Sequence, residues 1–356
     1  MSDFIICGIQ QMGVGVANMP EAWKWYRKLF GVDVKVFEEA AEANLMLPYT
    51  GGEPRSRHAA LAINMQGGGG FEIWQYTSRT PEGPKDEILL GDLGLYSGKI
   101  KCKNAQRTSE FWKGRDGNVL KGAQKDPRNK GHVFIKDPYG NIFDAVENES
   151  WFKNEKKPTG GTFGCIIGVS DIEASKKFYG EVLGYDQVLY EGEGQYEDFK
   201  VLPGGDATFK RAILGHGPRT GGFSKLFGDS EIELVQVVDR TPKKIFEGRF
   251  WGDLGFIHLC FDIVGMQALK ERCEAAGHPF TVDSFANLDD SFDMGEAAGH
   301  FSYIEDPDGA LIEFVETHKI PVMKKLGWYL DLRKKDQRKP VPNYILHAMA
   351  LNRVKD

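Results

Sequence analysis

The residues best suited to chemistry lie on two predicted strands in the last third of the chain. Residues 258–263 alternate between polar and apolar side chains, which predicts a strand whose apolar face packs under the next helix and whose opposite face carries His258. Glu313 stands among apolar residues in a second predicted strand. A buried carboxylate of this kind must be paired, protonated or bound to metal, whereas the ordinary alternative is an edge strand in water.

The same two positions recur four times along the chain, which argues against the ordinary alternative. The equivalent positions on four predicted first strands hold Gln11, Ser97, Gly164 and His258. The equivalent positions on four predicted last strands hold Glu72, Asp144, Glu233 and Glu313. Acids at all four last-strand positions are not expected of unrelated surface residues. The first and fourth copies keep two good donor side chains each, and the third has glycine in place of one.

Internal repeats define the elements that must position these residues. The motif EIWQ…RTP around Glu72 returns as ELVQ…RTP around Glu233, and the motifs GDLG and DPxG each occur twice in the same order. Asp-Pro-x-Gly favours a type I turn in a hairpin. Amphipathic segments such as residues 20–31 follow the first strands and end at glycine, as helices do. The repeats predict an α+β fold of four βαβββ modules in two tandem halves.

The repeats also divide the chain. The predicted parts are a first two-module domain (1–150), a polar linker (151–161), a second two-module domain (162–317) and a basic helical tail (318–356). In the tail, the sequence predicts a helix from Pro321 to about Asp336. We expect the tail to cover the sheets or to form a dimer contact.

Composition narrows the class of protein. The 45 basic and 51 acidic residues leave a net charge of −6, which gives no support for nucleic-acid binding. No apolar run approaches the roughly 20 residues that a membrane helix needs, and the first residues lack the pattern of a signal peptide. The five cysteines are odd in number and never spaced C-x-x-C, as expected of reduced thiols. We expect a cytoplasmic protein, monomer or homodimer, that acts on a small molecule.

The sequence resembles the vicinal oxygen chelate superfamily, which includes glyoxalase I, extradiol dioxygenases and bleomycin-resistance proteins. The resemblance covers about residues 8–317. It rests on the four modules, the two D-P-x-G hairpins, the run HLCF from His258 and the run LIEF that contains Glu313. It implies that two modules form a mixed-sheet cup and that each supplies two ligands, one from its first strand and a glutamate from its last, to a divalent metal.

Carried over by position, the resemblance implies the metal ligands Gln11, Glu72, His258 and Glu313, a set similar to that of animal-type glyoxalase I. Such ligands suit Zn²⁺, Ni²⁺, Co²⁺, Mn²⁺ or Fe²⁺. The implied function is a metal-dependent isomerase or lyase that stabilises an enediolate of a small oxygenated metabolite. A ligand glutamate would move the proton, with Glu313 preferred to Glu72, and Tyr303 is a further catalytic candidate.

The complete set requires a crossed arrangement. If modules one and four pair, one cup holds all four ligands and Gln11 lies within about 5 Å of His258 across one metal. If modules three and four pair instead, Glu233 replaces Gln11 and Glu72. Doubled glyoxalases resemble fused dimers with crossed pairing, so we expect the first arrangement.

Two other functions remain open. A metal-free binding or drug-resistance protein of the same fold is the alternative, because two modules have already lost their first-strand ligands. An extradiol dioxygenase is the third reading. It needs two histidines and one glutamate on Fe²⁺ with a tyrosine ten residues before the glutamate. Tyr303 fits that spacing, but Gly164 stands where the second histidine is expected.

Strand parity separates two further histidines from the site. His300 has the parity opposite to Tyr303 and should face away from the cup, and His132 should face the second, degraded cup. The other five lack a partnering pattern and are expected to be structural: His58, His216, His278, His318 and His347.

Overall fold

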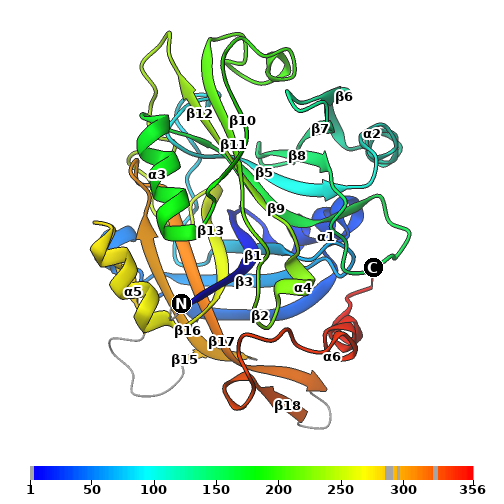
Figure 1. Ribbon diagram of the computed structural model, residues 1–356, viewed down its shortest axis with the longest axis vertical. Coiled ribbons are helices and arrows are strands. Elements are labelled where there is room, and N and C mark those ends of the chain that lie inside the picture. Colours follow the sequence, from blue (N-terminus) through cyan, green and yellow to red (C-terminus); the bar gives the residue numbers. More distant parts are fainter. Residues whose placement is uncertain (1–3, 285–291, 295–296, 324–327, 356) are drawn as a thin grey trace.

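The computed structural model describes residues 4–284, 292–294, 297–323 and 328–355, and it contains four βαβββ modules (Figure 1). Module one consists of β1 (Ile5–Gly15), α1 (Met19–Phe30), β2 (Val34–Glu42), β3 (Ser56–Ile63) and β4 (Gly70–Tyr76). Module two consists of β5 (Gly94–Cys102), α2 (Ala105–Lys113), β6 (Asn118–Lys125), β7 (Gly131–Lys136) and β8 (Ile142–Glu147).

The second half repeats this order. Module three consists of β9 (Thr159–Gly168), α3 (Ile172–Leu183), β10 (Gln187–Gly194), β11 (Phe209–Gly215), the short α4 (Ser224–Phe227) and β12 (Glu231–Val237). Module four consists of β13 (Gly255–Val264), α5 (Met266–Ala275), β14 (Val282–Asp283), β15 (Phe292–Met294), β16 (Ala297–Glu305) and β17 (Leu311–Met323). The tail adds β18 (Trp328–Asp331) and α6 (Asn343–Ala348).

The modules pair in the crossed arrangement. One sheet has the order β14-β16-β17-β13-β1-β4-β3-β2 and joins modules four and one; the other has the order β10-β11-β12-β9-β5-β8-β7-β6 and joins modules three and two. In each sheet the first strands of the two modules pair antiparallel, β1 with β13 and β5 with β9, and each first strand pairs parallel with its own last strand. The sheets are therefore mixed, and each takes one module from each half.

The main core lies on the faces of the sheets that carry the helices. One apolar cluster draws buried side chains from both sheets and all four module helices, among them Tyr26, Trp112, Phe178 and Leu269. The alternation expected for β13 holds, since Leu259, Phe261 and Ile263 belong to this cluster. None of the helices in the described ranges is long and apolar enough to cross a membrane.

Two repeated motifs lock a helix to a turn. The Tyr26 hydroxyl of α1 donates to Asp137 in the first D-P-x-G turn at 2.7 Å, and the Tyr179 hydroxyl of α3 donates to Asp306 in the second at 3.0 Å. Burial raises the pKa of Asp306 to about 6. The repeated tyrosine and Asp-Pro-x-Gly motifs therefore form the same contact twice, once between modules one and two and once between modules three and four.

Two other motifs connect the halves reciprocally. Arg79 of the first RTP motif pairs with Asp253 of the second GDLG motif at 2.5 Å, and Arg240 of the second RTP motif pairs with Asp92 of the first at 2.6 Å. The aspartates are buried and the arginines partly so. Each half thus supplies the counter-charge for the other.

The prediction of a helix from Pro321 to about Asp336 is wrong for the described part of this segment, and residues 324–327 lie outside the described residues. Strand β17 continues to Met323 and pairs antiparallel with β18, which is followed by a single 3₁₀ turn at Leu332–Lys334. Ile320 and Leu330 pack into an apolar cluster with Leu346 of α6. Extension of an existing strand and burial of its apolar face outweigh local helix propensity here. The helix of the tail is α6, in the NYILHA segment.

Candidate metal centre

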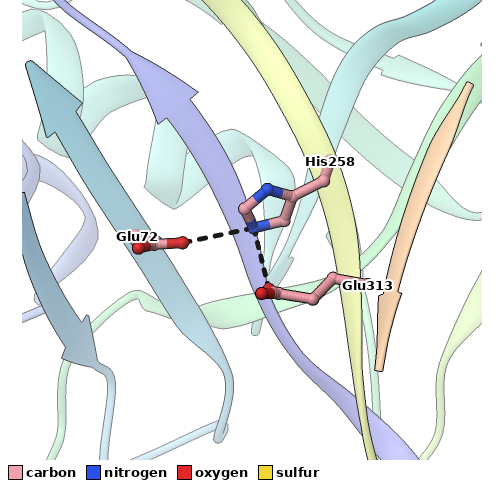
Figure 2. Close-up of side chains that lie close together, drawn as sticks. All are labelled: Glu72, His258 and Glu313. Carbon is pink, nitrogen blue, oxygen red and sulfur yellow. Dashed lines mark ion pairs between the residues drawn. The ribbon is translucent and has the colours of Figure 1, made fainter. Parts of the chain in front are cut away.

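Four polar side chains from four adjacent strands of the first sheet converge on one point. His258 of β13 places Nε2 3.4 Å from a carboxylate oxygen of Glu72 on β4 and 3.1 Å from one of Glu313 on β17, as Figure 2 shows. The amide nitrogen of Gln11 on β1 donates to Glu313 at 3.2 Å and to Glu72 at 3.5 Å. The four residues expected to form one site therefore lie together, and all are buried.

Local backbone features make room for the imidazole. Gly13 of β1 lies opposite His258 in the antiparallel pair, and a Cβ on Gly13 would stand 2.5 Å from the imidazole Cε1. Trp251 stacks nearly parallel to the ring, with 6.2 Å between the ring centroids. Neither residue was predicted from the sequence. The signals were an unexplained glycine in a strand and a tryptophan directly before the second GDLG.

The pKa values of Glu72 and Glu313 are shifted in opposite directions. Burial, and then the neighbouring Glu313, raise the pKa of Glu72 to about 7. Burial acts on Glu313 in the same direction, but His258 and the Tyr303 hydroxyl hold its pKa below the ordinary value. The pKa of His258 is raised because Glu313 and Glu72 outweigh its burial. Without a counter-ion, Glu72 is therefore partly protonated near pH 7, whereas Glu313 is ionised.

Two atoms of the cluster make no well-directed hydrogen bond to any residue of the described ranges. They are Oε1 of Gln11 and Nε2 of His258, and both are buried. Glu72, His258 and Glu313 each offer a ligand atom, and these atoms lie within 4.8 Å of one another. Buried polar atoms without partners are costly. Carboxylate, imidazole and amide groups fit a divalent first-row ion, so the residues present suit such a metal.

Tyr303 belongs to the same cluster. Its hydroxyl donates to Oε1 of Glu313 at 2.8 Å and lies 3.4 Å from Nδ1 of His258. Burial and the charge of Glu313 raise the pKa of Tyr303 well above its ordinary range, so the phenol stays protonated. The hydroxyl therefore fixes the orientation of Glu313.

A cavity of about 310 Å³ opens onto the cluster. Gln11, Glu72, Tyr303 and Glu313 form its polar end. This volume is at the small end of the roughly 300–1,000 Å³ usual for ligand sites.

The comparisons with known proteins agree with this geometry. Residues 163–314 match the family model of the Glyoxalase/Bleomycin resistance protein/Dioxygenase superfamily. A point mutant of glyoxalase I from Zea mays has a TM-score of 0.53 at 15% identity, over 87% of this chain and 92% of that one. The match to the family model covers residues 163–314, and the whole chain shares its fold with the maize protein.

A candidate dioxygenase from Bacillus subtilis is as similar in structure to this chain as the maize glyoxalase I mutant is. Its TM-score is 0.53 at 13% identity, over 88% of this chain and 86% of that one. No curated protein matches the sequence. At these identities the likeness shows the shared fold and leaves the reaction to the site residues.

The second cup of this superfamily fold holds a network of buried ion pairs. Lys99 of β5 places Nζ 2.5 Å from Glu231 and also pairs with Glu233. Arg211 pairs with Glu233 at 2.5 Å and with Asp198 at 2.8 Å. The cup that combines modules two and three thus contains the cation Lys99 beside Glu233, the acid at the position equivalent to Glu72 and Glu313.

The remaining predicted residues lie as follows. His132 faces this second cup, with Nδ1 2.9 Å from Asp144, as its parity indicated. Gly164 and Ser97 lie in the second sheet, away from His258. His300 lies outside the cavity, with its ring 4.9 Å from that of His318. Lys99 was missed, although alternation places it on the same strand face as Ser97.

Proposed function

We propose that this chain is a metal-dependent isomerase or lyase similar to glyoxalase I, acting on a small molecule with adjacent oxygen atoms. The observation that supports this proposal most directly is the convergence of Gln11, Glu72, His258 and Glu313 at the end of one cavity, where Oε1 of Gln11 has no hydrogen-bond partner among the described residues. These four residues would hold the metal. When bound, the metal would act as a Lewis acid toward the adjacent oxygens of the substrate.

The chain's own residues would perform the proton transfer. Glu72 and Glu313 both line the cavity, so either carboxylate can accept a proton from a carbon atom next to a carbonyl and return it to the neighbouring carbon. General acid–base help of this kind contributes about 10²–10⁴-fold to rate.

The contacts favour Glu72 as the mobile base, in contrast to the preference for Glu313 from the sequence. Glu313 is held by the Tyr303 hydroxyl at 2.8 Å, the Gln11 amide at 3.2 Å and His258 at 3.1 Å. Glu72 has longer contacts, 3.5 Å to Gln11 and 3.4 Å to His258. A less constrained carboxylate is better able to move a proton, so we assign that role to Glu72 and the anchoring role to Glu313.

The two alternatives can be separated from this proposal. The dioxygenase reading requires two histidines and one carboxylate as ligands. In the crossed arrangement, the other first strand of the cup is β1, so the position of the second histidine is held by Gln11 and not by Gly164. With Fe²⁺ and catechols, an oxygen electrode should therefore register no uptake. A binding protein would take up ligand without exchanging a proton.

The deciding experiment combines elemental analysis with isotope exchange. Protein purified without chelator should contain close to one divalent ion per chain, because Lys99 fills the second cup. With α-hydroxycarbonyl compounds in D₂O, the loaded protein should introduce deuterium at the carbon next to the carbonyl. His258→Ala and Glu313→Gln should lose the metal, and Glu72→Gln should reduce exchange more than it reduces metal content.

A matched control uses another histidine–glutamate pair. His58 lies 3.4 Å from Glu38 at the surface, and His58→Ala should leave metal content unchanged. A wild-type chain that takes up no divalent ion under loading conditions refutes the enzyme proposal in favour of the binding protein. Oxygen uptake with catechols refutes it in favour of the dioxygenase.

A further inference from the structure

The surface of the cavity at the proposed metal centre is mostly apolar, although charged residues such as Lys35, Glu39 and Arg57 also line it. Its wall includes Phe37, Leu61, Trp251, Phe301 and Val315 from the first sheet and its loops. A polar substrate would lose its hydration here without regaining hydrogen bonds, which is unfavourable. Apolar surface, in contrast, gains roughly 25 cal/mol for each Å² removed from water.

The charged groups of the cavity leave little to attract a polyanion. Among the described lining residues the two cations are Lys35 and Arg57, and each is paired, Lys35 with Glu38 at 3.3 Å and Arg57 with Glu39 at 2.6 Å. One guanidinium nitrogen of Arg57, Nη1, has no hydrogen-bond partner in the described part of the chain. One hydrogen-bond acceptor of a ligand can bind to Nη1 of Arg57. A ligand carboxylate that engaged both guanidinium nitrogens would compete with Glu39.

Two segments outside modules one and four complete the apolar wall. Phe223, Leu226 and Phe227 come from the α4 region of module three, and Met349 comes from the 3₁₀ turn Met349–Asn352 of the tail. These segments pack on one another. Phe223, Leu226 and Phe227 share one apolar cluster with Leu346 of α6, and Met349 packs against that cluster.

The tail is fastened where it reaches the cavity. Arg353 donates to both oxygens of Glu155 at 2.7 and 2.9 Å, and the amide of Val354 donates to the carbonyl of Asp33 at 2.8 Å. Met349 therefore has a defined position in the wall.

We propose that the site takes a substrate with an aliphatic or aromatic body, its adjacent oxygens at the Gln11–Glu313 end and its body against α4 and Met349. This inference rests on the proposed function for the oxygen end only. The placement of the substrate's apolar body rests on the apolar residues that line the cavity. A substrate conjugated to a charged peptide, or one that carries a phosphate, does not suit this wall.

The first test compares two hydroxamates that differ only at the far end. Octanohydroxamic acid ends in a methyl group, and suberic acid monohydroxamate ends in a carboxylate on a chain of the same length. The metal-loaded protein should bind the first at least tenfold more tightly, measured by displacement of the neutral fluorescent probe N-phenyl-1-naphthylamine. Equal or tighter binding of the carboxylate-ended compound overturns the proposal and points to Arg57 as an anion site.

The second test places a charge in the wall. Met349→Glu should weaken binding of N-phenyl-1-naphthylamine at least tenfold, whereas Leu351→Glu, in the same turn but 70% exposed, should not. An equal effect of the two substitutions, or none from either, overturns the role of the tail. Circular dichroism of both variants checks that they are folded.

The two proposals fail differently. Binding of N-phenyl-1-naphthylamine requires only the apolar cavity, so it should persist in protein treated with EDTA. The hydroxamate group, in contrast, should lose affinity when the metal is removed. Probe binding with no effect of metal on hydroxamates refutes the proposed metal enzyme alone, and absence of probe binding refutes the apolar substrate class alone.

Discussion

Gln11 places an uncharged amide between two carboxylates. Its Nε2 donates to both Glu72 and Glu313, so Gln11→Glu removes two hydrogen bonds and adds a like charge. We expect the metal-free variant to lose about 1–3 kcal/mol of unfolding free energy. A divalent ion offsets the added charge, so the rise in melting temperature on metal addition should exceed that of the wild type.

The control for Gln11 is Gln106→Glu, a change at an exposed position of α2. Scanning calorimetry with EDTA and with metal checks both variants. An equal metal-induced rise in wild type and Gln11→Glu would show that Gln11 lies outside the ion's reach.

Tyr303 acts by positioning Glu313. Tyr303→Phe removes the 2.8 Å hydrogen bond to that carboxylate and keeps the ring. A hydrogen bond to a charged group is worth about 1.5–3 kcal/mol, so kcat should fall by about 10–100-fold while metal content stays at the wild-type level. Steady-state kinetics with metal analysis tests this, and Tyr344→Phe, at a 71% exposed position, is the control. Loss of the metal in Tyr303→Phe would make the tyrosine a structural part of the ligand set instead.

At the scale of elements, the two sheets have the same strand pairing but opposite chemistry in their cups. In the first sheet the two acids of the cluster form ion pairs with His258, and in the second sheet Glu233 forms ion pairs with Lys99 and Arg211. Burial would raise the pKa of Glu233, but Arg211 and Lys99 hold it at about 2, below the ordinary 4.5. Ion pairing of this kind contributes to stability above pH 4.5, and the contribution is lost as the pH falls toward 2.

Lys99→Met should therefore destabilise the protein strongly at neutral pH. Breaking a buried ion pair costs about 3–5 kcal/mol, because the remaining charges stay buried. The deficit relative to wild type should narrow as the pH falls from 4.5 toward 2, since Glu233 then takes up a proton in the wild type as well. Urea unfolding across this pH range measures the difference.

Lys125→Met is the matched control for Lys99, because Lys125 is 59% exposed and lies 3.9 Å from Glu147. It should change the unfolding free energy little at any pH. A constant deficit for Lys99→Met at all pH values would contradict the electrostatic explanation and indicate a loss of packing.

At the scale of the whole molecule, the halves are interleaved. Each sheet crosses from one half to the other through an antiparallel pair, β1–β13 or β5–β9, and Arg79 and Arg240 form reciprocal ion pairs. A protease site inserted after the exposed Lys156 should allow the chain to be cut between the halves. The cut protein should elute as one particle and unfold in a single transition.

Size-exclusion chromatography and urea unfolding of the cut protein test this arrangement, with the uncut insertion variant as the control. Two half-length species in native buffer, or two separate transitions after cutting, would contradict it. Separation of the two halves only in denaturant would support it, since the halves can part only when the strand pairs β1–β13 and β5–β9 are both broken.

The sequence determined the features that depend on local periodicity. Alternation along single strands placed His258 and Glu313 on the cup faces, because neighbouring side chains of a strand must point to opposite sides. The repeats gave the four modules, and the same register added Gln11 and Glu72. Only the sheet order established that modules one and four share a cup, because strand pairing between modules depends on contacts far apart in the chain.

The tertiary structure alone decided which residues surround the site. The sequence of the tail favoured a helix after Pro321, but β17 extended and paired with β18 because its apolar face could be buried against α6. Met349, Trp251 and the α4 segment reach the cavity from regions with no ligand motif. Their positions follow from the packing of distant segments, which strand and helix periods do not encode. The same packing places Lys99 among the acids of the second cup, where its ammonium group forms ion pairs with Glu231 and Glu233.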